Sequence, residues 1–143
     1  MTNTPTKIVY TAKATVTGGR AGHAKSDDGV LDLALTAPKE TGGPGTGTNP
    51  EQLFAVGYGA CFQGALGLVA KKHGVDASGS TVDIAVGFGP EGDSFAITAD
   101  ITATIPGVDD VKAQELVEAA HQVCPYSKAT RGNVPVTVTG KGA

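Results

Sequence analysis

The stretch NPEQLFAVGYGACFQGALGLVAKKHG, residues 49–74, decides the fold. Asn49 suits the N-cap of a helix, Pro50 suits its first helical position, and Gln52 completes a capping-box pattern. The glycine that closes the stretch is typical of the position just after a helix, and basic residues precede it as the helix dipole favours. We therefore predict one long helix, from Pro50 to about His73.

This predicted helix is apolar almost all round. Gln63 is the only strongly polar residue in the range 53–70, which just reaches the length of a membrane-spanning helix. Glycines dilute its hydrophobicity, and a helix buried on all sides of a core has the same signature, so we expect a core helix and no membrane. Small residues recur on one face, where another helix could approach closely, and we interpret them as tight core packing. They are Gly57, Ala60, Gly64 and Gly67.

The segments around this helix predict strands. Apolar residues alternate in residues 7–19 and 30–35, which the turn GGRAGH separates. Residues 81–105 predict a hairpin, and residues 133–140 a last strand, which a proline places at the edge of a sheet. The Gly/Pro-rich residues 36–49 predict a long loop, which we consider as a mobile lid.

A second, amphipathic helix is predicted from about Asp109, and Pro125 ends it. Its apolar positions follow the helical period and are Ala113, Leu116, Val117, Ala120 and Cys124. The order of elements, with hairpins rather than strand–helix alternation, predicts an α+β fold with an antiparallel sheet. One sheet and one amphipathic helix cannot cover the all-apolar first helix in so small a chain, so we infer an obligate homodimer.

Length and composition predict one globular domain over residues 1–143, with 40% hydrophobic and 17% charged residues. The net charge of −3 provides no basic footprint, so we expect no nucleic-acid partner. The start of the chain has no secretory pattern, so we expect a cytoplasmic protein. Cysteines in that compartment are more often catalytic, metal-binding or inert than part of a structural bridge.

Cys61 and Cys124 are the two cysteines, and each has more than one reading. Cys61 lies in mid-helix, where the helix dipole no longer acts, so a reactive thiolate there needs a cation from elsewhere; otherwise it is a small core hydrophobe. Cys124 lies on the inward face of the second helix. The two thiols could therefore meet as a peroxidatic and a resolving thiol, or their placement is coincidence. The histidines show no ligand spacing with either cysteine, so we expect no metal and no cofactor.

Three segments carry a family resemblance: GGRAGH, TNPEQLFAVGYGACFQGAL and VCPYSKATRGNVPVTV. Together, from Tyr10 to Val138, they resemble the organic hydroperoxide resistance proteins of the OsmC-like superfamily. The helix departs from the family pattern at Val56, Gly59 and Gln63. The resemblance implies an OsmC-like fold, in which an antiparallel sheet wraps around two central helices of an intertwined homodimer.

The same resemblance implies a thiol peroxidase for alkyl and fatty-acid hydroperoxides. It implies that Cys61 is the peroxidatic thiol, Cys124 the resolving thiol, and Arg20 with Glu51 the activating pair. A dithiol, such as lipoamide on a lipoylated protein, would be the reductant. Glu51 and Cys61 are ten residues apart on one helix, about 15 Å along its axis, so we expect Arg20 and Glu51 to reach Cys61 of the other subunit. Candidate substrate-contacting residues, each of which could equally fill a core, are Leu53, Phe54, Phe62 and Tyr126.

Two other functions stay open on the residues alone. A non-enzymatic binder of hydrophobic ligands would use the thiol pair as a redox sensor and would form a disulfide with negligible turnover. A cysteine hydrolase would need a histidine beside Cys61; no motif places one there, and Cys124 would be left unexplained.

Overall fold

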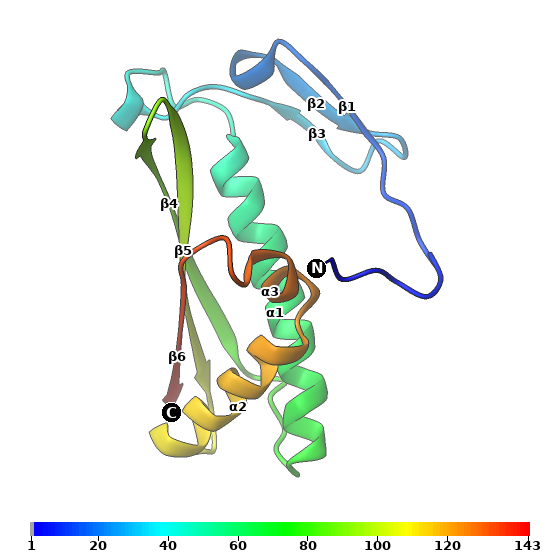
Figure 1. Cartoon of the computed structure of the whole chain (residues 1–143), viewed down its shortest axis with the longest axis vertical. Helices are drawn as coiled ribbons and strands as arrows, with labels where there is room; N and C mark the ends of the chain where they lie inside the picture. Colours follow the sequence, from blue (N-terminus) through cyan, green and yellow to red (C-terminus); the bar gives the residue numbers. More distant parts are fainter. Residues whose placement is uncertain (1) are drawn as a thin grey trace. The chain divides into compact units, whose positions relative to one another are not determined.

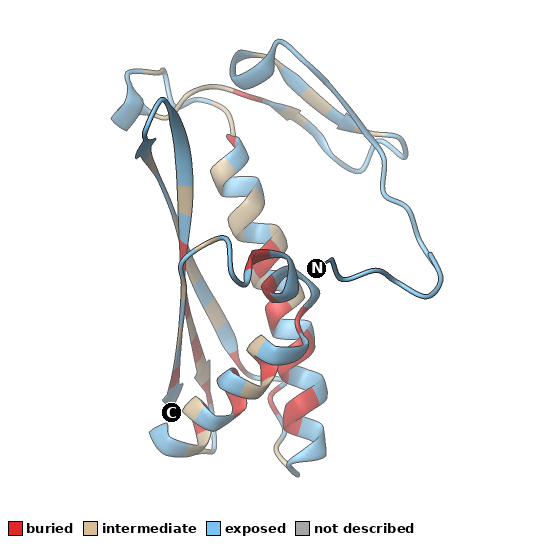
Figure 2. Cartoon of the chain, in the orientation of Figure 1, coloured by how far each residue is buried: buried red, intermediate tan, exposed pale blue. Residues whose placement is uncertain are grey.

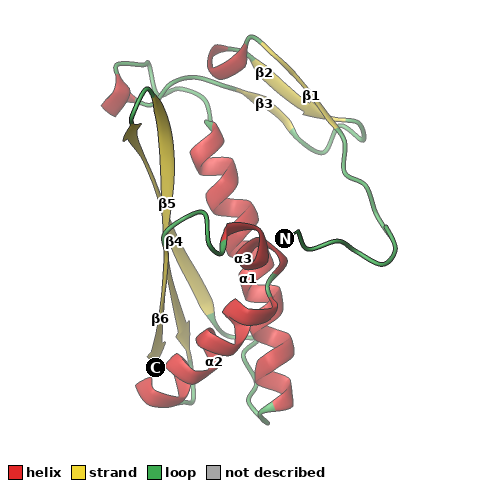
Figure 3. Ribbon diagram, viewed as in Figure 1, coloured by secondary structure: helices red, strands yellow, loops and turns green. Residues whose placement is uncertain are grey.

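The computed structural model describes residues 2–143, which form two compact units that divide between Leu53 and Phe54. Each unit holds a three-stranded sheet, and most of the helical structure is in the second (Figures 1 and 3). In chain order the strands and α-helices are β1 (Ala14–Thr17), β2 (His23–Ser26), β3 (Asp32–Ala34), α1 (Pro50–Lys72), β4 (Thr81–Glu91), β5 (Ser94–Ile105), α2 (Asp110–Val123), α3 (Pro125–Thr130) and β6 (Val136–Gly142). Whether they make a single domain stays a prediction.

In the first unit, β1, β2 and β3 pair antiparallel in that order. β1 is shorter than predicted, because its partner β2 has only four residues and a ladder ends where its hydrogen-bonding partner ends. The apolar side chains before it, Ile8, Val9 and Tyr10, are exposed and lie outside any strand. β2 is missing from the prediction, because its sequence HAKS lacks the apolar alternation that marks a strand.

The Gly/Pro-rich residues 36–49 form a hydrogen-bonded loop in the same unit. The Thr36 amide donates to the Thr48 carbonyl, and the Gly47 amide donates to the Thr36 hydroxyl, so the two ends of the loop are tied together. A 3-10 helix, Lys39–Thr41, lies between them. The loop is therefore locally organised, and its movement as a lid stays a prediction.

The second unit contains the predicted hairpin, in which β4 and β5 pair antiparallel from Thr81↔Thr104 to Glu91↔Ser94. A tight turn joins them at Gly92, whose φ of +58° suits glycine. β6 lies at the edge of this sheet as predicted, but it pairs with β5 in parallel, so the prediction of an antiparallel sheet is wrong for this strand. The physical reason is the helical connection between β5 and β6, which returns the chain to the end where β5 began.

The predicted start of α1 is confirmed, since the Asn49 side chain accepts a hydrogen bond of 2.8 Å from the Gln52 amide. The second bond of a capping box is not formed. The Gln52 side chain instead accepts from the Thr48 hydroxyl at 2.9 Å. In α2, the Asp109 carboxylate caps the helix by accepting from the Lys112 amide, and every predicted inward position is buried.

Pro125 ends α2, as predicted, but it also begins α3. Proline is well suited to a first helical position, because it has no amide hydrogen to leave unsatisfied there. Cys124 is thus both the C-cap of α2 and the N-cap of α3, with extended backbone angles of φ −62° and ψ 124°. The sequence predicts the break at this proline but not the helix that follows.

The core of the second unit gathers one face of α1, the inward face of α2 and alternate residues of β5 (Figure 2). Val56 and Leu68 are 72% and 67% exposed, so the single chain leaves part of the apolar helix α1 uncovered, as the sequence predicts. The small residues Gly64 and Gly67 face open space, so they do not serve core packing within the chain. α1 is long and apolar enough to cross a membrane by length and composition, a test that core helices of soluble proteins also pass.

Candidate functional site

The two thiols meet inside the second unit. Cys61 lies half-buried in α1, and Cys124 is fully buried at the junction of α2 and α3. The Cys124 thiol points at Cys61, with 3.5 Å between the two Sγ atoms, and both cysteines are free. They are 63 positions apart in the chain, so only the packing of α1 against the α2–α3 junction brings them together.

The surroundings of Cys61 act on its ionisation in opposite directions. Burial has the largest effect and raises the pKa of the Cys61 thiol, because desolvation disfavours the charged thiolate. The backbone amide of Tyr126 donates to the sulfur and lowers the pKa, and the neighbouring Cys124 raises it. The net shift is upward. The surroundings of Cys61 in the second unit therefore keep its thiol mainly in the neutral form.

Arg20 and Glu51 form an ion pair in the first unit. Arg20 Nη1 and Nη2 donate to the two oxygens of Glu51 at 3.0 and 2.8 Å, which is a bidentate arrangement. The hydrogen bonds from Arg20 lower the pKa of Glu51, and the same bonds raise the pKa of Arg20. The carboxylate therefore stays ionised and holds the guanidinium in a fixed orientation.

The turn that carries Arg20 depends on its glycines. Gly18 and Gly19 have φ values of +74° and +59°, which only glycine adopts without strain. A Cβ at Gly22 would lie 1.9 Å from the Thr17 carbonyl oxygen, so the chain could not turn back this closely with any other residue. The glycines of the segment GGRAG therefore allow the tight backbone turn that carries Arg20.

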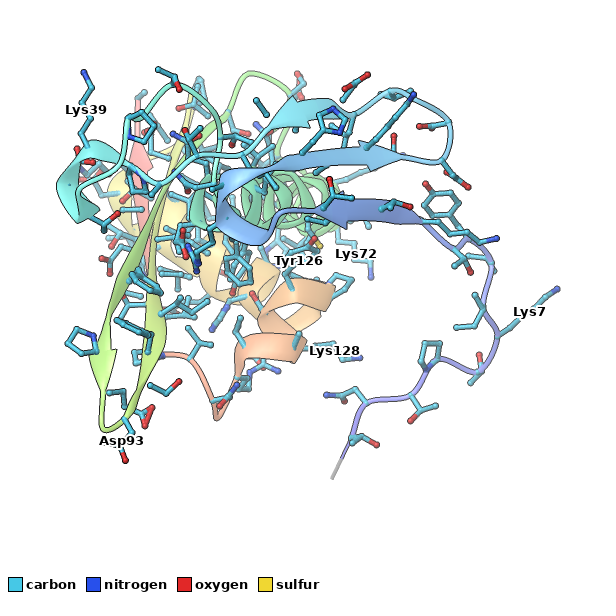
Figure 4. The ribbon with its side chains drawn as sticks, turned by 90° about the horizontal axis from the view of Figure 1, so that it is seen from above. Lys7, Lys39, Lys72, Asp93, Tyr126 and Lys128 are labelled. Atoms are coloured by element: carbon cyan, nitrogen blue, oxygen red, sulfur yellow. The ribbon has the colours of Figure 1, made fainter. Side chains whose placement is uncertain are left out.

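An aromatic cluster lies beside the thiols. The Tyr126 ring packs against those of Phe54 and Tyr58, with centroids 6.1 and 5.7 Å apart. Figure 4 shows Tyr126 lying toward α1, whereas Lys128 of the same helix points away. A Cβ at Gly57 would lie 2.8 Å from the Tyr126 hydroxyl, so this glycine makes room for the ring.

The other predicted substrate-contacting residues are placed differently. Phe62 is fully buried in the core, and Leu53 is at the end of the first unit with 36% exposure. Gln63, one of the departures from the family pattern, donates to the Ser80 carbonyl at 2.9 Å and so secures the start of β4. Only Phe54 and Tyr126 of the four candidates are thus brought together beside the thiols.

Sequence reasoning missed a buried polar network next to the cysteines. The Tyr58 hydroxyl contacts the hydroxyls of Ser127 and Thr130, and Ser127 also contacts the His121 ring. Tyr58, Ser127 and Thr130 are all buried. One signal was present in the sequence: Tyr58 precedes Cys61 by three residues, which places both on neighbouring turns of one helix face.

Known proteins are similar to this chain over most of its length. The model of the OsmC-like protein family matches residues 43–139, a range that includes both cysteines and Glu51. The chain belongs to the OsmC-like protein family. Within it, an organic hydroperoxide resistance protein of Xanthomonas axonopodis pv. citri is 51% identical over 94% of this chain and 96% of the relative.

Solved structures of OsmC-like proteins match across nearly the whole chain. An organic hydroperoxide resistance protein from Elizabethkingia anophelis has a TM-score of 0.89 at 49% identity, with 96% of this chain and 99% of that chain covered. The protein OhrB of Bacillus subtilis has a TM-score of 0.84 at 48% identity, with 95% and 100% covered. The OsmC-like α+β fold, and the branch of the organic hydroperoxide resistance proteins, are therefore established for this chain.

Proposed function

We propose that this OsmC-like protein is a thiol peroxidase that reduces alkyl and fatty-acid hydroperoxides to alcohols. The observation that carries the proposal is the approach of the Cys61 and Cys124 sulfurs to 3.5 Å from different helices. An inert core cysteine has no need of a second thiol within reach. The names of the relatives, which are organic hydroperoxide resistance proteins, support the substrate class.

The proposed reaction has two oxidative steps. The Cys61 thiolate attacks the outer peroxide oxygen, the O–O bond breaks, and the products are a Cys61 sulfenic acid and, after protonation, the alcohol. The Cys124 sulfur then attacks the Cys61 sulfur, and the departing hydroxyl takes the thiol hydrogen and leaves as water. A dithiol such as lipoamide on a lipoylated protein reduces the resulting Cys61–Cys124 disulfide by thiol–disulfide exchange.

Arg20 supplies the positive charge that this reaction needs. Burial raises the pKa of Cys61, so the thiolate must be favoured by a cation, and a guanidinium is always charged. The same charge would stabilise the alkoxide that forms as the O–O bond breaks. Glu51 is the positioning partner, since its two oxygens hold the guanidinium fork.

The proposed active enzyme is a cytoplasmic homodimer in which the activating pair and the thiols come from different subunits. Glu51 and Cys61 are ten residues apart on the continuous helix α1, about 15 Å along its axis. The exposed apolar side chains of α1, Val56 and Leu68, and its bare glycines Gly64 and Gly67 fit a face that a second copy covers.

The proposed substrate contacts are apolar. Phe54 and Tyr126 provide an aromatic surface beside Cys61, and Leu53, which is 36% exposed, is a further apolar candidate. Phe62 would contact substrate only if the core opened, since it is fully buried in the chain. An apolar surface of this kind would favour a bulky, oily hydroperoxide over hydrogen peroxide.

The first test measures peroxide consumption with dihydrolipoamide as reductant. We expect wild type to consume cumene hydroperoxide faster than hydrogen peroxide, and Cys61→Ser to consume neither above background. Equal rates for wild type and Cys61→Ser would refute the peroxidase. If wild type forms the disulfide but does not turn over, the chain is instead a redox-sensing binder.

The second test decides whether the site is shared between subunits. Chains carrying Glu51→Ala and chains carrying Cys61→Ser are mixed, unfolded and refolded together. If the site is shared, each heterodimer has one site with an intact Cys61 and an intact Glu51, and one site in which both residues are changed. Activity should therefore return in one of the two sites. No recovery in verified heterodimers would place the whole site within one subunit.

A further inference from the structure

A buried network of hydrogen bonds connects α1 to the junction of α2 and α3. His121 Nδ1 lies 2.7 Å from the Ser127 hydroxyl, which lies 2.8 Å from the Tyr58 hydroxyl. The Tyr58 hydroxyl lies 3.1 Å from the Thr130 hydroxyl, and that hydroxyl donates to the Ser127 carbonyl at 3.2 Å. In the described part of the chain, every buried side-chain nitrogen and oxygen has a partner.

The donor and the acceptor of each hydrogen bond in this network follow from counting hydrogens. Thr130 uses its one hydrogen on the Ser127 carbonyl, so its oxygen must accept from Tyr58. Tyr58 must then accept from Ser127, and Ser127 from His121 Nδ1. All four bonds exist together only if Nδ1 of His121 carries a hydrogen. Burial and the neighbouring charge of Arg131 lower the pKa of His121, so the neutral imidazole is favoured, and the hydrogen count then places its one hydrogen on Nδ1.

The positions of these residues place the network around both thiols. Tyr58 comes three residues before Cys61 on α1. His121 and Ser127 come three residues before and three after Cys124, one on each of the helices that this cysteine joins. Next to Ser127 is Tyr126, the residue whose amide donates to the Cys61 sulfur. The network therefore ties down the chain on both sides of Cys124.

We propose that His121, Ser127 and Tyr58 are positioning residues for disulfide formation, acting by holding the Cys124 thiol against Cys61. This inference rests on the proposed peroxidase function. After the first oxidation, the Cys61 sulfenic acid has two fates. It condenses with the Cys124 thiol to give a disulfide and water, or a second hydroperoxide oxidises it to a sulfinic acid and leaves as the alcohol. The network favours the first fate by keeping Cys124 within reach.

Core filling alone does not explain the network. Phenylalanine would fill the same apolar space as Tyr58, and alanine would suit the inside of α3 as well as Ser127. Burying hydroxyls costs free energy unless each one is paired, so a fully paired set indicates that a fixed geometry is held there. The geometry that it holds includes the 3.5 Å approach of the two sulfurs.

The experiment measures how Cys61 is partitioned between its two fates. The purified full-length protein is reduced and treated with increasing cumene hydroperoxide, and mass spectrometry gives the ratio of disulfide to sulfinic acid. We expect Tyr58→Phe and His121→Leu to reach equal amounts of the two products at about fivefold less hydroperoxide than wild type. That factor corresponds to about 1 kcal/mol, the net value of one hydrogen bond, and it is the minimum for Tyr58→Phe, which removes two.

A matched pair at position 121 separates positioning from general destabilisation. The side-chain amide of asparagine can donate from the place of Nδ1, whereas that of glutamine is one methylene further out. We therefore expect His121→Asn to restore the wild-type ratio and His121→Gln to behave like His121→Leu. Denaturant midpoints measured in parallel keep folding defects apart from changes in the ratio.

The outcomes distinguish this inference from the function on which it rests. If wild type forms the disulfide and Tyr58→Phe gives the same ratio, the positioning role is refuted and the peroxidase stands. If His121→Asn is no better than His121→Leu, the donor at Nδ1 is refuted as the cause. If the hydroperoxide oxidises Cys61 in none of the proteins, the proposed function itself is refuted.

Discussion

Oxidation of the thiol pair should stabilise the folded chain, and the separation of the cysteines determines by how much. A Cys61–Cys124 disulfide would close a loop that spans 63 positions. Such a cross-link removes conformational entropy from the unfolded chain, worth about 4 kcal/mol at 25 °C for a loop of this length. To form it, the sulfurs must approach from 3.5 Å to about 2.05 Å, and any resulting strain reduces the gain.

The gain in the free energy of unfolding should therefore be about 3–4 kcal/mol. Urea denaturation followed by circular dichroism measures it, with samples that are fully reduced or treated with one equivalent of cumene hydroperoxide. With a slope of about 1–3 kcal/mol per molar urea, the midpoint should rise by about 1–4 M. All samples are compared at one protein concentration, because the stability of a dimer depends on it.

Cys124→Ser is the matched control, since it retains Cys61 but cannot form the bond. Its midpoint should be the same in the reduced and treated samples. If mass spectrometry confirms the disulfide in wild type and the midpoint does not rise, the folded structure must distort to form it. The 3.5 Å approach would then not be the geometry in which the thiols react.

Three further predictions concern helix α1 and the Arg20–Glu51 ion pair. In Gly57→Ala, the new Cβ displaces the Tyr126 ring from Phe54 and Tyr58, a loss of about 0.5–1.5 kcal/mol for each of the two pairs against a helix gain of about 1 kcal/mol. Activity should fall, and thermal denaturation should show a net loss of stability of about 0–2 kcal/mol. Because a second copy is proposed to cover Gly64, Gly64→Ala should weaken the dimer in light scattering, although its Cβ has open space within one chain. An unchanged dimer together with a gain of about 1 kcal/mol from helix propensity would refute that cover. Arg20 lowers the pKa of Glu51 in the folded chain below its value in the unfolded chain. The ion pair therefore stabilises the fold fully at pH values above the pKa of unfolded Glu51. This stabilisation is lost as the pH falls through the lower pKa of folded Glu51. Glu51→Gln should therefore be less stable than wild type by about 0.2–1 kcal/mol at pH 7 and equal to it at low pH, as denaturation at both pH values will show.

Local signals in the sequence were enough for most of the elements. Asn49 caps α1 as predicted, and Asp109, the predicted start of the second helix, caps α2, because a cap involves only residues within one turn. The β4–β5 hairpin also follows from adjacent residues and a short turn. The parallel pairing of β6 does not, because strand direction depends on where α2 and α3 leave the chain in space. β2 was missed because its pairing, rather than any apolar pattern of its own, makes it a strand.

The candidate site also has one part that local sequence predicts and another that depends on tertiary packing. The family motifs in the sequence identify Cys61 and Cys124, and the helical period puts Cys124 on the inward face of α2. The 3.5 Å between their sulfurs, the Tyr126 amide on Cys61 and the His121 network are products of packing between helices far apart in the chain. Sequence by itself thus determined which groups we propose for the chemistry, since side-chain identity and short-range caps are local properties. Only the tertiary structure decided which of them touch, because distances between remote segments depend on how their apolar faces pack.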